Sequence, residues 1–266
     1  MKNNLKIYII NLKKDIEKKE YMKRLCEEYD LDVEFIEAVY GKSLTKNEIS
    51  LVYSKTKSQS KIKRELALPE LGCALSHRSI YKKMIDNNIK EALILEDDIE
   101  FDNKLLGLLS KKSLFPKNWE LVLLGHHTGS SSYLSTRSSI WWKKNLYNDF
   151  NLKIPSEVSK GTYGYLINQN GAKKLFDELR EIKMPIDHYT GDNKFTNLYI
   201  IKPEIIKINK VMSDEMTTMS DRENLQKSKA SKNIILKKII RALGLFKLIM
   251  FLVNNLKRIY PLRRYK

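Results

Sequence analysis

The chain has little cysteine and no long uninterrupted apolar run. Cys26 and Cys73 are its two cysteines, and they form no Cys–Cys metal-ligand spacing. We therefore expect free thiols in a reducing compartment, with Cys26 in the core. No stretch of about 18 uncharged apolar residues is present, so the sequence predicts no membrane-spanning helix. A charged Met1-Lys2 start followed at once by an apolar strand leaves no room for a cleavable signal peptide, and we expect none.

Acidic residues are missing from the C-terminal part of the chain. The formal net charge is +17, yet residues 227–266 hold twelve Lys or Arg and no Asp or Glu, which leaves a net charge of +5 for residues 1–226. Uniform basicity would have favoured a nucleic-acid partner. Basic residues concentrated beside apolar ones favour an anionic membrane surface instead, and we expect no nucleic-acid binding.

Residues 233–254 have the pattern of an amphipathic helix. At about 100° per residue, Lys237, Lys238 and Arg241 fall on one face and apolar side chains fall on the other. A helix with a basic face, an apolar face and aromatic residues is typical of an interfacial membrane anchor. The alternative is a C-terminal helix that packs on the rest of the protein.

The chain divides into three predicted parts. Residues 1–211 form one α/β domain, 212–232 a flexible linker, and 233–266 the basic amphipathic tail. In the domain, a strand over 5–11, a helix to about Tyr29 and a strand over 33–36 predict a β-α-β unit, the first half of a doubly wound sheet. The other expected elements are helices over 71–87 and 171–179 and strands over 92–96, 119–124, 163–167, 198–201 and 205–208. Residues 53–64 are polar without periodicity and predict a mobile surface loop, and 126–139 predict a long loop.

Three consecutive carboxylates follow an apolar run at residues 92–95. The run predicts a buried strand, and Glu96, Asp97 and Asp98 then lie where that strand leaves the core. Ligands in open α/β sheets bind at the carboxyl ends of strands. Three clustered acids repel one another unless a cation or a hydroxyl-rich ligand is present, which suits Mg²⁺ or Mn²⁺ holding a diphosphate. The alternative is an ordinary acidic turn.

The sequence around this cluster resembles glycosyltransferase family 25. The resemblance rests on Leu68–Phe101, which reads Leu-Pro-Glu-Leu-Gly-Cys-Ala-Leu-Ser-His and continues to Ile-Leu-Glu-Asp-Asp, and on further blocks in the same order at residues 9–12, 35–41, 161–165, 171–172 and 185–187. It implies a GT-A-like, Rossmann-type single domain with a mixed sheet flanked by helices. It also implies an inverting transfer of a hexose, most often galactose from UDP-galactose, to a lipooligosaccharide or lipopolysaccharide acceptor.

The resemblance and the residue chemistry together suggest roles for individual side chains. We expect Asp98 to bind Mn²⁺ or Mg²⁺, with help from Asp97 and His188. Because adjacent strand residues point to opposite sides, Glu96 and Asp98 should face one way and Asp97 the other. The residues expected at the UDP-sugar donor are Asn11, Leu12, Glu70, Ser76, His77, Glu96 and Asp97.

Several of these residues have a structural alternative. His77 could be a satisfied structural histidine, and Glu70 could cap the helix that follows it. Asp187, which follows Pro185 in an expected loop, is our candidate for the general base. Asp192 is the competing candidate, and capping of the next segment is the alternative role of Asp187. The family often has arginines where this chain has Lys13, Lys14, Lys18 and Lys19, and lysine keeps the charge without bidentate contacts. A separate alternative is that lysine side chains hold the diphosphate and no metal is required.

The remaining expectations concern the setting of the reaction. The acceptor would be a lipid-linked oligosaccharide, reached by a cytoplasmic protein held peripherally at the cytoplasmic face of the inner membrane through its basic tail. His126 or His127 could reach the site, and Trp141 or Trp142 could stack on a sugar or close the loop onto the body. Two other readings are a metal-dependent phosphohydrolase and a catalytically inactive, membrane-attached sugar-binding protein.

Overall fold

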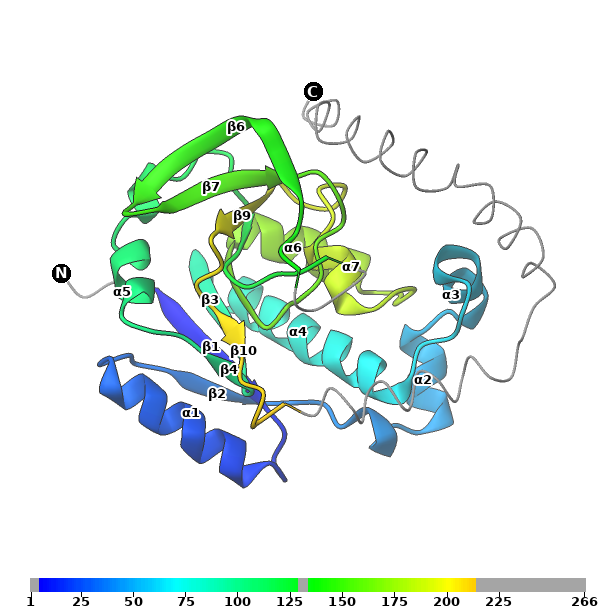
Figure 1. The fold of residues 1–266 in the computed structure, drawn as a ribbon. Helices are drawn as coiled ribbons and strands as arrows, with labels where there is room; N and C mark the ends of the chain where they lie inside the picture. Colours follow the sequence, from blue (N-terminus) through cyan, green and yellow to red (C-terminus); the bar gives the residue numbers. More distant parts are fainter. Residues whose placement is uncertain (1–4, 129–133, 214–266) are drawn as a thin grey trace, which may run out of the picture.

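The computed structural model describes residues 5–128 and 134–213 and shows a mixed eight-stranded sheet with helices on both faces (Figure 1). The strand order is β2-β1-β3-β8-β5-β9-β7-β6, and β4 and β10 form a separate two-stranded sheet. The strands are β1 (Lys6–Asn11), β2 (Glu34–Glu37), β3 (Glu91–Glu96), β4 (Ile99–Glu100), β5 (Leu121–Leu123), β6 (Ser138–Tyr147), β7 (Phe150–Pro155), β8 (Gly164–Asn168), β9 (Leu198–Lys202) and β10 (Lys207–Ile208). The helices are α1 (Ile16–Glu28), α2 (Lys46–Val52), α3 (Lys55–Ile62), α4 (Leu68–Asp86), α5 (Lys104–Leu109), α6 (Gln169–Glu178) and α7 (Ile186–Thr190), with 3₁₀ turns η1 (Gly41–Ser43) and η2 (Lys112–Leu114).

The first three strands of the large sheet are parallel, as the predicted β-α-β opening requires. β1 lies between β2 and β3, and the register pairs Asn11 with Glu37 and Ile10 with Glu96. The carboxyl ends of all three strands therefore meet at one edge of the sheet. The chain runs from β1 to the outer strand β2 and then crosses back past β1 to β3, which makes the gap between β1 and β3 a topological switch point.

The sheet is buried between two apolar layers because alternate strand residues point to opposite faces. In β1, Ile7 and Ile9 pack with Met22 and Cys26 of α1, whereas Tyr8 enters the opposite layer. The first layer also contains apolar residues of α5, and the second contains residues of α4, α6 and α7. The prediction that Cys26 is a core residue is confirmed, and both cysteines are free thiols.

The second half of the sheet is mostly antiparallel. β8 pairs antiparallel with both β3 and β5, and β7 pairs antiparallel with both β6 and β9, while β5 and β9 are parallel. The predicted mixed α/β sheet flanked by helices is therefore confirmed. The doubly wound pattern is confined to the β1–β2–β3 half.

Two local predictions are wrong. Residues 53–64 are not a surface loop, because α3 occupies most of them; Ser54 accepts a hydrogen bond from the Lys57 N–H, and the buried Ser58 hydroxyl donates to the Arg64 carbonyl. The Ser54 cap and the Ser58 hydrogen bond stabilise a helix that has no apolar periodicity. The segment after Pro185 is also helical, since α7 follows immediately instead of a loop.

The sequence reading also missed the long hairpin of β6 and β7. The predicted loop over 126–139 gives way to β6 at Ser138. The predicted tail over 233–266 and most of the predicted linker lie outside the described residues. No helix within residues 5–128 and 134–213 has the length and apolar character needed to cross a membrane.

Candidate active site at the carboxyl edge of β1 and β3

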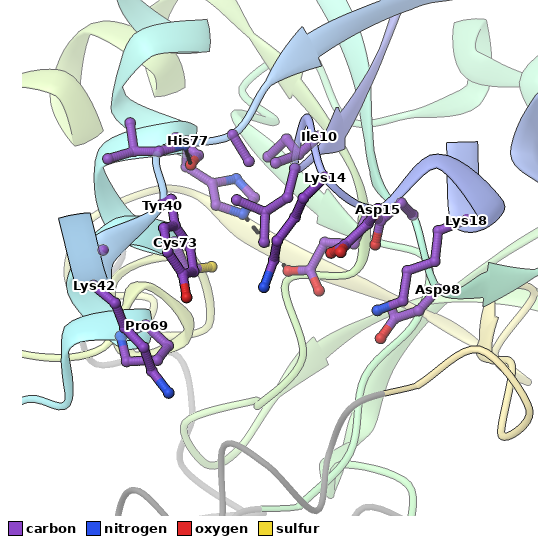
Figure 2. A pocket seen from close by; sticks show the side chains of 17 residues that line it. Ile10, Lys14, Asp15, Lys18, Tyr40, Lys42, Pro69, Cys73, His77 and Asp98 are labelled. Carbon is purple, nitrogen blue, oxygen red and sulfur yellow. Dashed lines mark hydrogen bonds and ion pairs between the residues drawn. The ribbon is translucent and has the colours of Figure 1, made fainter. Parts of the chain in front are cut away.

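A pocket of about 490 Å³ opens at the switch point between β1 and β3 (Figure 2). Its walls come from the ends of β1 and β3, the start of α1, the segment after β2 and one face of α4. The pocket lining includes Leu12, Lys14, Lys18, Tyr40, Gly41, Lys42, Cys73, Ser76, His77, Glu96, Asp97 and Asp98. Six of the residues predicted for donor and metal binding therefore share one pocket, namely Leu12, Ser76, His77, Glu96, Asp97 and Asp98.

Asn11 connects the end of β1 to the acidic cluster. Its side-chain amide donates to the Asp97 carboxylate at 2.7 Å and to the Asp15 carbonyl at 3.0 Å. Asn11 is itself buried, so these bonds satisfy an amide that would otherwise be costly to bury. Asn11 thus orients Asp97 in the turn that follows β3. Asn11 was predicted to contact the donor, and the contact that the structure shows for it is this one with Asp97.

The carboxyl groups of Asp97 and Asp98 resist ionisation. Burial raises the pKa of Asp97 to about 6, against the hydrogen bond from Asn11, which lowers it. Burial, followed by the charges of Glu96 and Asp97, raises the pKa of Asp98 to about 7, while Lys18 lowers it. Ionising two carboxyl groups that are partly desolvated and close to other acids costs free energy, and a bound cation would offset that cost.

Positive side chains line the same pocket. Lys14 comes from the turn between β1 and α1, Lys18 comes from the first turn of α1, and Lys42 comes from η1 on the opposite wall. The Lys14 ammonium lies 4.6 Å from the centre of the Tyr40 ring, which keeps it beside the opening. Cations and carboxylates around one pocket can bind a diphosphate directly or through a divalent metal.

α4 forms the wall opposite β1 because it packs very closely against the segment after β2. A Cβ atom on Gly72 would lie 2.4 Å from the Val39 carbonyl oxygen, and one on Gly41 would lie 1.8 Å from the Leu68 carbonyl oxygen. Ser76 adds a direct bond, since its hydroxyl accepts from the Val39 N–H at 2.8 Å. The resemblance suggested Ser76 as a donor residue, and the structure shows it fixing this wall.

Three potential metal ligands converge deeper in the pocket. The ligand atoms of Cys73, His77 and Glu96 all lie within 4.8 Å of one another. His77 Nε2 is 3.7 Å from Glu96 Oε1, and His77 Nδ1 is 2.8 Å from the Tyr165 hydroxyl. Burial raises the pKa of the Cys73 thiol well above its usual range. The sequence reading missed Cys73 as a site residue, although its i,i+4 spacing to His77 on a predicted helix was the available signal.

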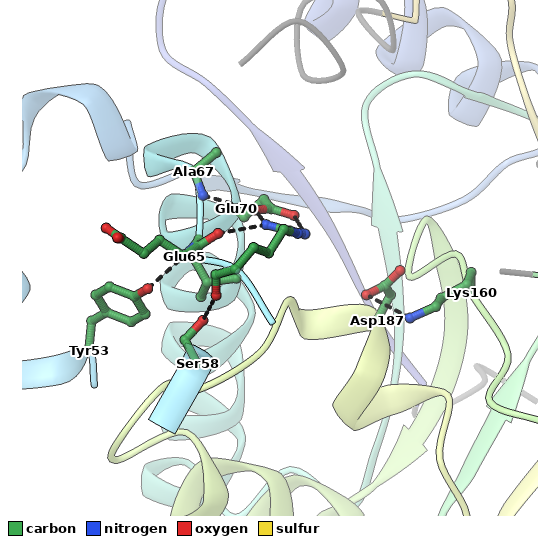
Figure 3. A network of polar contacts seen from close by, with 9 residues as sticks. Tyr53, Ser58, Glu65, Ala67, Glu70, Lys160 and Asp187 are labelled. Carbon is green, nitrogen blue, oxygen red and sulfur yellow. Dashed lines mark hydrogen bonds and ion pairs between the residues drawn. The ribbon is translucent and has the colours of Figure 1, made fainter. Parts of the chain in front are cut away.

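Glu70 has the capping role that was its structural alternative. Its carboxylate accepts from the Ala67 N–H at 2.9 Å, before the first turn of α4. The two oxygens also receive a bidentate contact from Arg64, at 2.6 and 2.7 Å (Figure 3). Glu70 is buried, and these bonds compensate its desolvation. A contact of Glu70 with the donor stays a prediction.

Asp187 and His188 lie on α7, outside the lining of the pocket between β1 and β3. Asp187 lies on α7 with Oδ1 at 3.8 Å from the Lys160 ammonium (Figure 3), and that buried Oδ1 accepts no hydrogen bond from the described residues. Burial and the charge of Lys160 lower the pKa of His188, which helps to keep its imidazole neutral. Among the described residues, His188 does not join Asp97 and Asp98 in a set of close ligand atoms. Its role as a third metal ligand stays a prediction.

Asp192 has a local partner. Its carboxylate accepts from the Lys194 N–H at 3.0 Å in the turn after α7. Neither Asp187 nor Asp192 lines the pocket between β1 and β3. Their base roles therefore stay predictions, with Asp187 carrying the buried acceptor oxygen.

The other aromatic and imidazole candidates also lie outside that pocket. His126 is buried with Nδ1 3.3 Å from Glu204, and burial lowers its pKa to about 4. Trp142 packs against Tyr199 with ring centres 5.4 Å apart, whereas Trp141 is 71% exposed. Trp142 therefore closes the hairpin onto the body, and Trp141 is the one available to an external ligand.

The fold and pocket define a mixed α/β protein that offers acids and lysines to a ligand at the switch point of its sheet. The sequence model of "Glycosyltransferase family 25 (LPS biosynthesis protein)" matches residues 4–190, and the chain belongs to this family. The predicted family membership is confirmed.

The relatives include animal proteins of much greater length. Procollagen galactosyltransferase 1-A of Xenopus laevis is 31% identical over 191 residues, which cover 69% of this chain and 30% of that protein. Procollagen galactosyltransferase 2 of Homo sapiens is 30% identical over 195 residues, covering 69% and 29%. A glycosyltransferase 25 family member of Aedes aegypti is 30% identical over 200 residues, covering 69% and 30%. The match thus spans about 30% of the length of these relatives.

A solved structure of similar size was also found. It is described as a glycosyltransferase involved in the glycosylation of the major capsid of PBCV-1, and it is 10% identical with a TM-score of 0.42. The alignment covers 82% of this chain and 98% of that one.

Proposed function

We propose that this protein transfers a hexose from a nucleotide sugar to a glycan hydroxyl, with UDP-galactose as the first candidate donor. The observation that carries the proposal is the pocket at the β1–β3 switch point, where Glu96, Asp97 and Asp98 meet lysines from two walls. Family membership supports glycosyl transfer as the reaction class. The galactosyltransferase names of several relatives support galactose as the sugar.

The pocket chemistry fits the needs of a departing diphosphate. The leaving UDP develops negative charge, which a divalent cation or a positive side chain must stabilise. Asp98 is the carboxylate we assign to Mn²⁺ or Mg²⁺, because its raised pKa reflects burial and neighbouring negative charge. Lys14, Lys18 and Lys42 are the residues we assign to the phosphates, as lysine is a common phosphate binder.

Transfer with inversion requires a base for the attacking hydroxyl. In a single displacement, the acceptor oxygen attacks the anomeric carbon as UDP leaves, and its proton must pass to a nearby group. We propose Asp187 as the group that accepts this proton. Its buried Oδ1 accepts no hydrogen bond from the described residues and lies beside Lys160. Asp192 is the alternative, with its carboxylate turned to its own loop.

The acceptor we propose is a lipid-linked oligosaccharide of the lipooligosaccharide or lipopolysaccharide type. The description of the matching family includes lipopolysaccharide biosynthesis. The basic, acid-free residues 227–266 support work at the cytoplasmic face of an anionic inner membrane.

Isothermal titration with UDP tests the donor site. We expect UDP to bind the full chain more tightly with Mn²⁺ than without it. The Asp98→Asn variant should bind UDP in the presence of Mn²⁺ about tenfold or more weakly than the wild type. Asp149→Asn is the matched control, because Asp149 is exposed in the β6–β7 turn at the other end of the sheet.

The results separate the reaction class from the metal assignment. Absence of UDP binding with and without metal would contradict the nucleotide-sugar proposal. Equal UDP affinity in wild type and Asp98→Asn with Mn²⁺ would contradict the role of Asp98 alone. Transfer of radiolabelled galactose from UDP-galactose to a lipooligosaccharide acceptor would then indicate glycosyl transfer, whereas release of labelled galactose 1-phosphate with UMP would indicate phosphate hydrolysis.

A further inference from the structure

A second set of ligand atoms lies in the same pocket as the acidic turn but has a different chemistry. Cys73 and His77 are one turn apart on α4, and Glu96 ends β3 directly across from them. Their thiol, imidazole and carboxylate atoms all lie within 4.8 Å of one another. Residues at i and i+4 share a helix face, so the two α4 side chains meet the strand together.

The imidazole of His77 has a buried nitrogen that lacks a hydrogen-bond partner among the described residues. Its side chain is fully buried, and Nε2 has no hydrogen-bond partner among the described residues. Buried polar atoms in native proteins are nearly always paired. This nitrogen instead faces Glu96 Oε1 across 3.7 Å.

The other side of the imidazole ring is held in place. Nδ1 is bonded to the Tyr165 hydroxyl at 2.8 Å, and that hydroxyl is 2.7 Å from the Tyr81 hydroxyl. When Nδ1 donates its proton to Tyr165, Nε2 presents its lone pair to the pocket. Metal-binding histidines are usually oriented by such a second hydrogen bond.

We propose that Cys73, His77 and Glu96 bind a borderline-soft divalent cation, with Zn²⁺ as the fitting ion. A thiolate, an imidazole and a carboxylate are all zinc ligands, whereas Mg²⁺ takes oxygen ligands. Metal–ligand distances of about 2.0–2.3 Å place tetrahedral ligands about 3.3–3.7 Å apart. The 3.7 Å between His77 Nε2 and Glu96 Oε1 meets this spacing. The Cys73 sulfur lies within 4.8 Å of both ligand atoms, so binding a metal requires it to move inward by about 1 Å at most.

The site leaves room for one more ligand. Three protein ligands leave a fourth position in tetrahedral coordination, and all three line the open pocket. The site is distinct from the oxygen pair of Asp97 and Asp98, and it does not depend on the proposed glycosyl transfer.

Cobalt titration of the full, metal-free chain tests this site. Co²⁺ bound by a thiolate gives a charge-transfer absorption in the near ultraviolet, and we expect this band to saturate at one ion per chain and to disappear when Zn²⁺ is added. Cys73→Ser should abolish the band and weaken Zn²⁺ binding by more than about 100-fold, because a direct ligand is lost. His77→Gln should weaken Zn²⁺ binding while circular dichroism checks that the fold is kept.

The other cysteine supplies the matched control. Cys26 is buried in α1 on the opposite face of the sheet, so Cys26→Ala should keep the cobalt band. A band that is absent from the wild type, that persists in Cys73→Ser, or that is lost in Cys26→Ala would overturn the proposal. A UDP titration of the same metal-free protein reports on the donor pocket separately, so failure of one proposal is distinguishable from failure of the other.

Discussion

The acidic turn after β3 places three half-buried carboxylates side by side in the pocket wall. Asp97 and Asp98 have pKa values of about 6 and about 7, against an ordinary value of 3.8. Desolvation is the largest cause in both, and the neighbouring acids add to it. Asn11 and Lys18 offset only part of this cost. The three acids thus differ from an ordinary solvated turn, because the pocket walls bury them in part.

These raised pKa values predict an unusual pH dependence of stability. The folded state holds a proton on Asp98 more tightly than the unfolded chain does, so the stability from this proton is complete below about pH 4 and is lost as the pH rises through about 7. In metal-free buffer, we expect the free energy of unfolding to fall from about pH 5 to pH 8 by about 1–2 kcal/mol more in wild type than in Asp98→Asn. Urea denaturation at both pH values measures this difference, and parallel pH profiles would contradict it.

The individual side chains could be predicted to different degrees. Glu96, Asp97 and Asp98 were recognisable because a buried apolar strand ran directly into them. Ser76 and His77 were found through the resemblance, but their partners Val39 and Tyr165 are distant in sequence and depend on the fold.

At the scale of elements, α4 positions the pocket, and its first turn depends on a buried ion pair. Arg64 and Glu70 have side chains that are 19% and 2% exposed. Glu70 also caps Ala67, so the pair fixes both the start of α4 and the segment that follows α3.

We expect Arg64→Ala to lower the free energy of unfolding by about 3 kcal/mol, because it leaves the Glu70 carboxylate buried without its cation. The control is Asp86→Asn at the other end of α4, which removes an exposed contact with Lys82 and should cost less than about 0.5 kcal/mol. Urea unfolding curves of both variants give the comparison. A loss below about 1 kcal/mol for Arg64→Ala would show that water replaces the guanidinium.

Elements were predictable where burial left a simple pattern. β1, β3 and β8 are apolar on both faces because helices cover the sheet on both sides, and each was expected from its run of apolar residues. β6 was missed because it is the edge strand and most of its residues are exposed or half-buried. α3 was missed because its stability comes from Ser54 and Ser58 instead of an apolar stripe.

At the scale of the whole molecule, charge separates the described body from the C-terminal segment. Residues 227–266 contribute twelve positive charges and no negative ones, whereas the pocket lies at the carboxyl edge of β1 and β3. A membrane-bound acceptor would need the pocket to work close to a lipid surface. We propose that the C-terminal charge supplies that proximity, through an attraction of about 1 kcal/mol per basic residue near an anionic membrane.

This proposal predicts that vesicle binding depends on where the positive charges lie. Changing Lys237, Lys238 and Arg241 together to Glu in the full chain should reduce binding to phosphatidylglycerol vesicles by more than about 100-fold at low salt. UDP binding in solution should be unchanged, because the variant keeps every described residue that lines the pocket. Vesicle co-sedimentation and UDP titration measure the two properties on the same protein.

A variant with the same net charge tests whether position matters. Lys111, Lys117 and Lys143 are exposed on the body, and changing these three to Glu alters the total charge by the same amount. We expect this control to bind vesicles within about threefold of wild type, since membrane attraction falls off within a Debye length of the surface. Equal losses in the two triple variants would mean that total charge governs vesicle binding, and the tail would then have no special role as an anchor. A selective loss in the tail variant would instead place the membrane contact in residues 233–266. An acceptor at the lipid surface would then be the simplest reason for a protein with this donor pocket to carry such a segment.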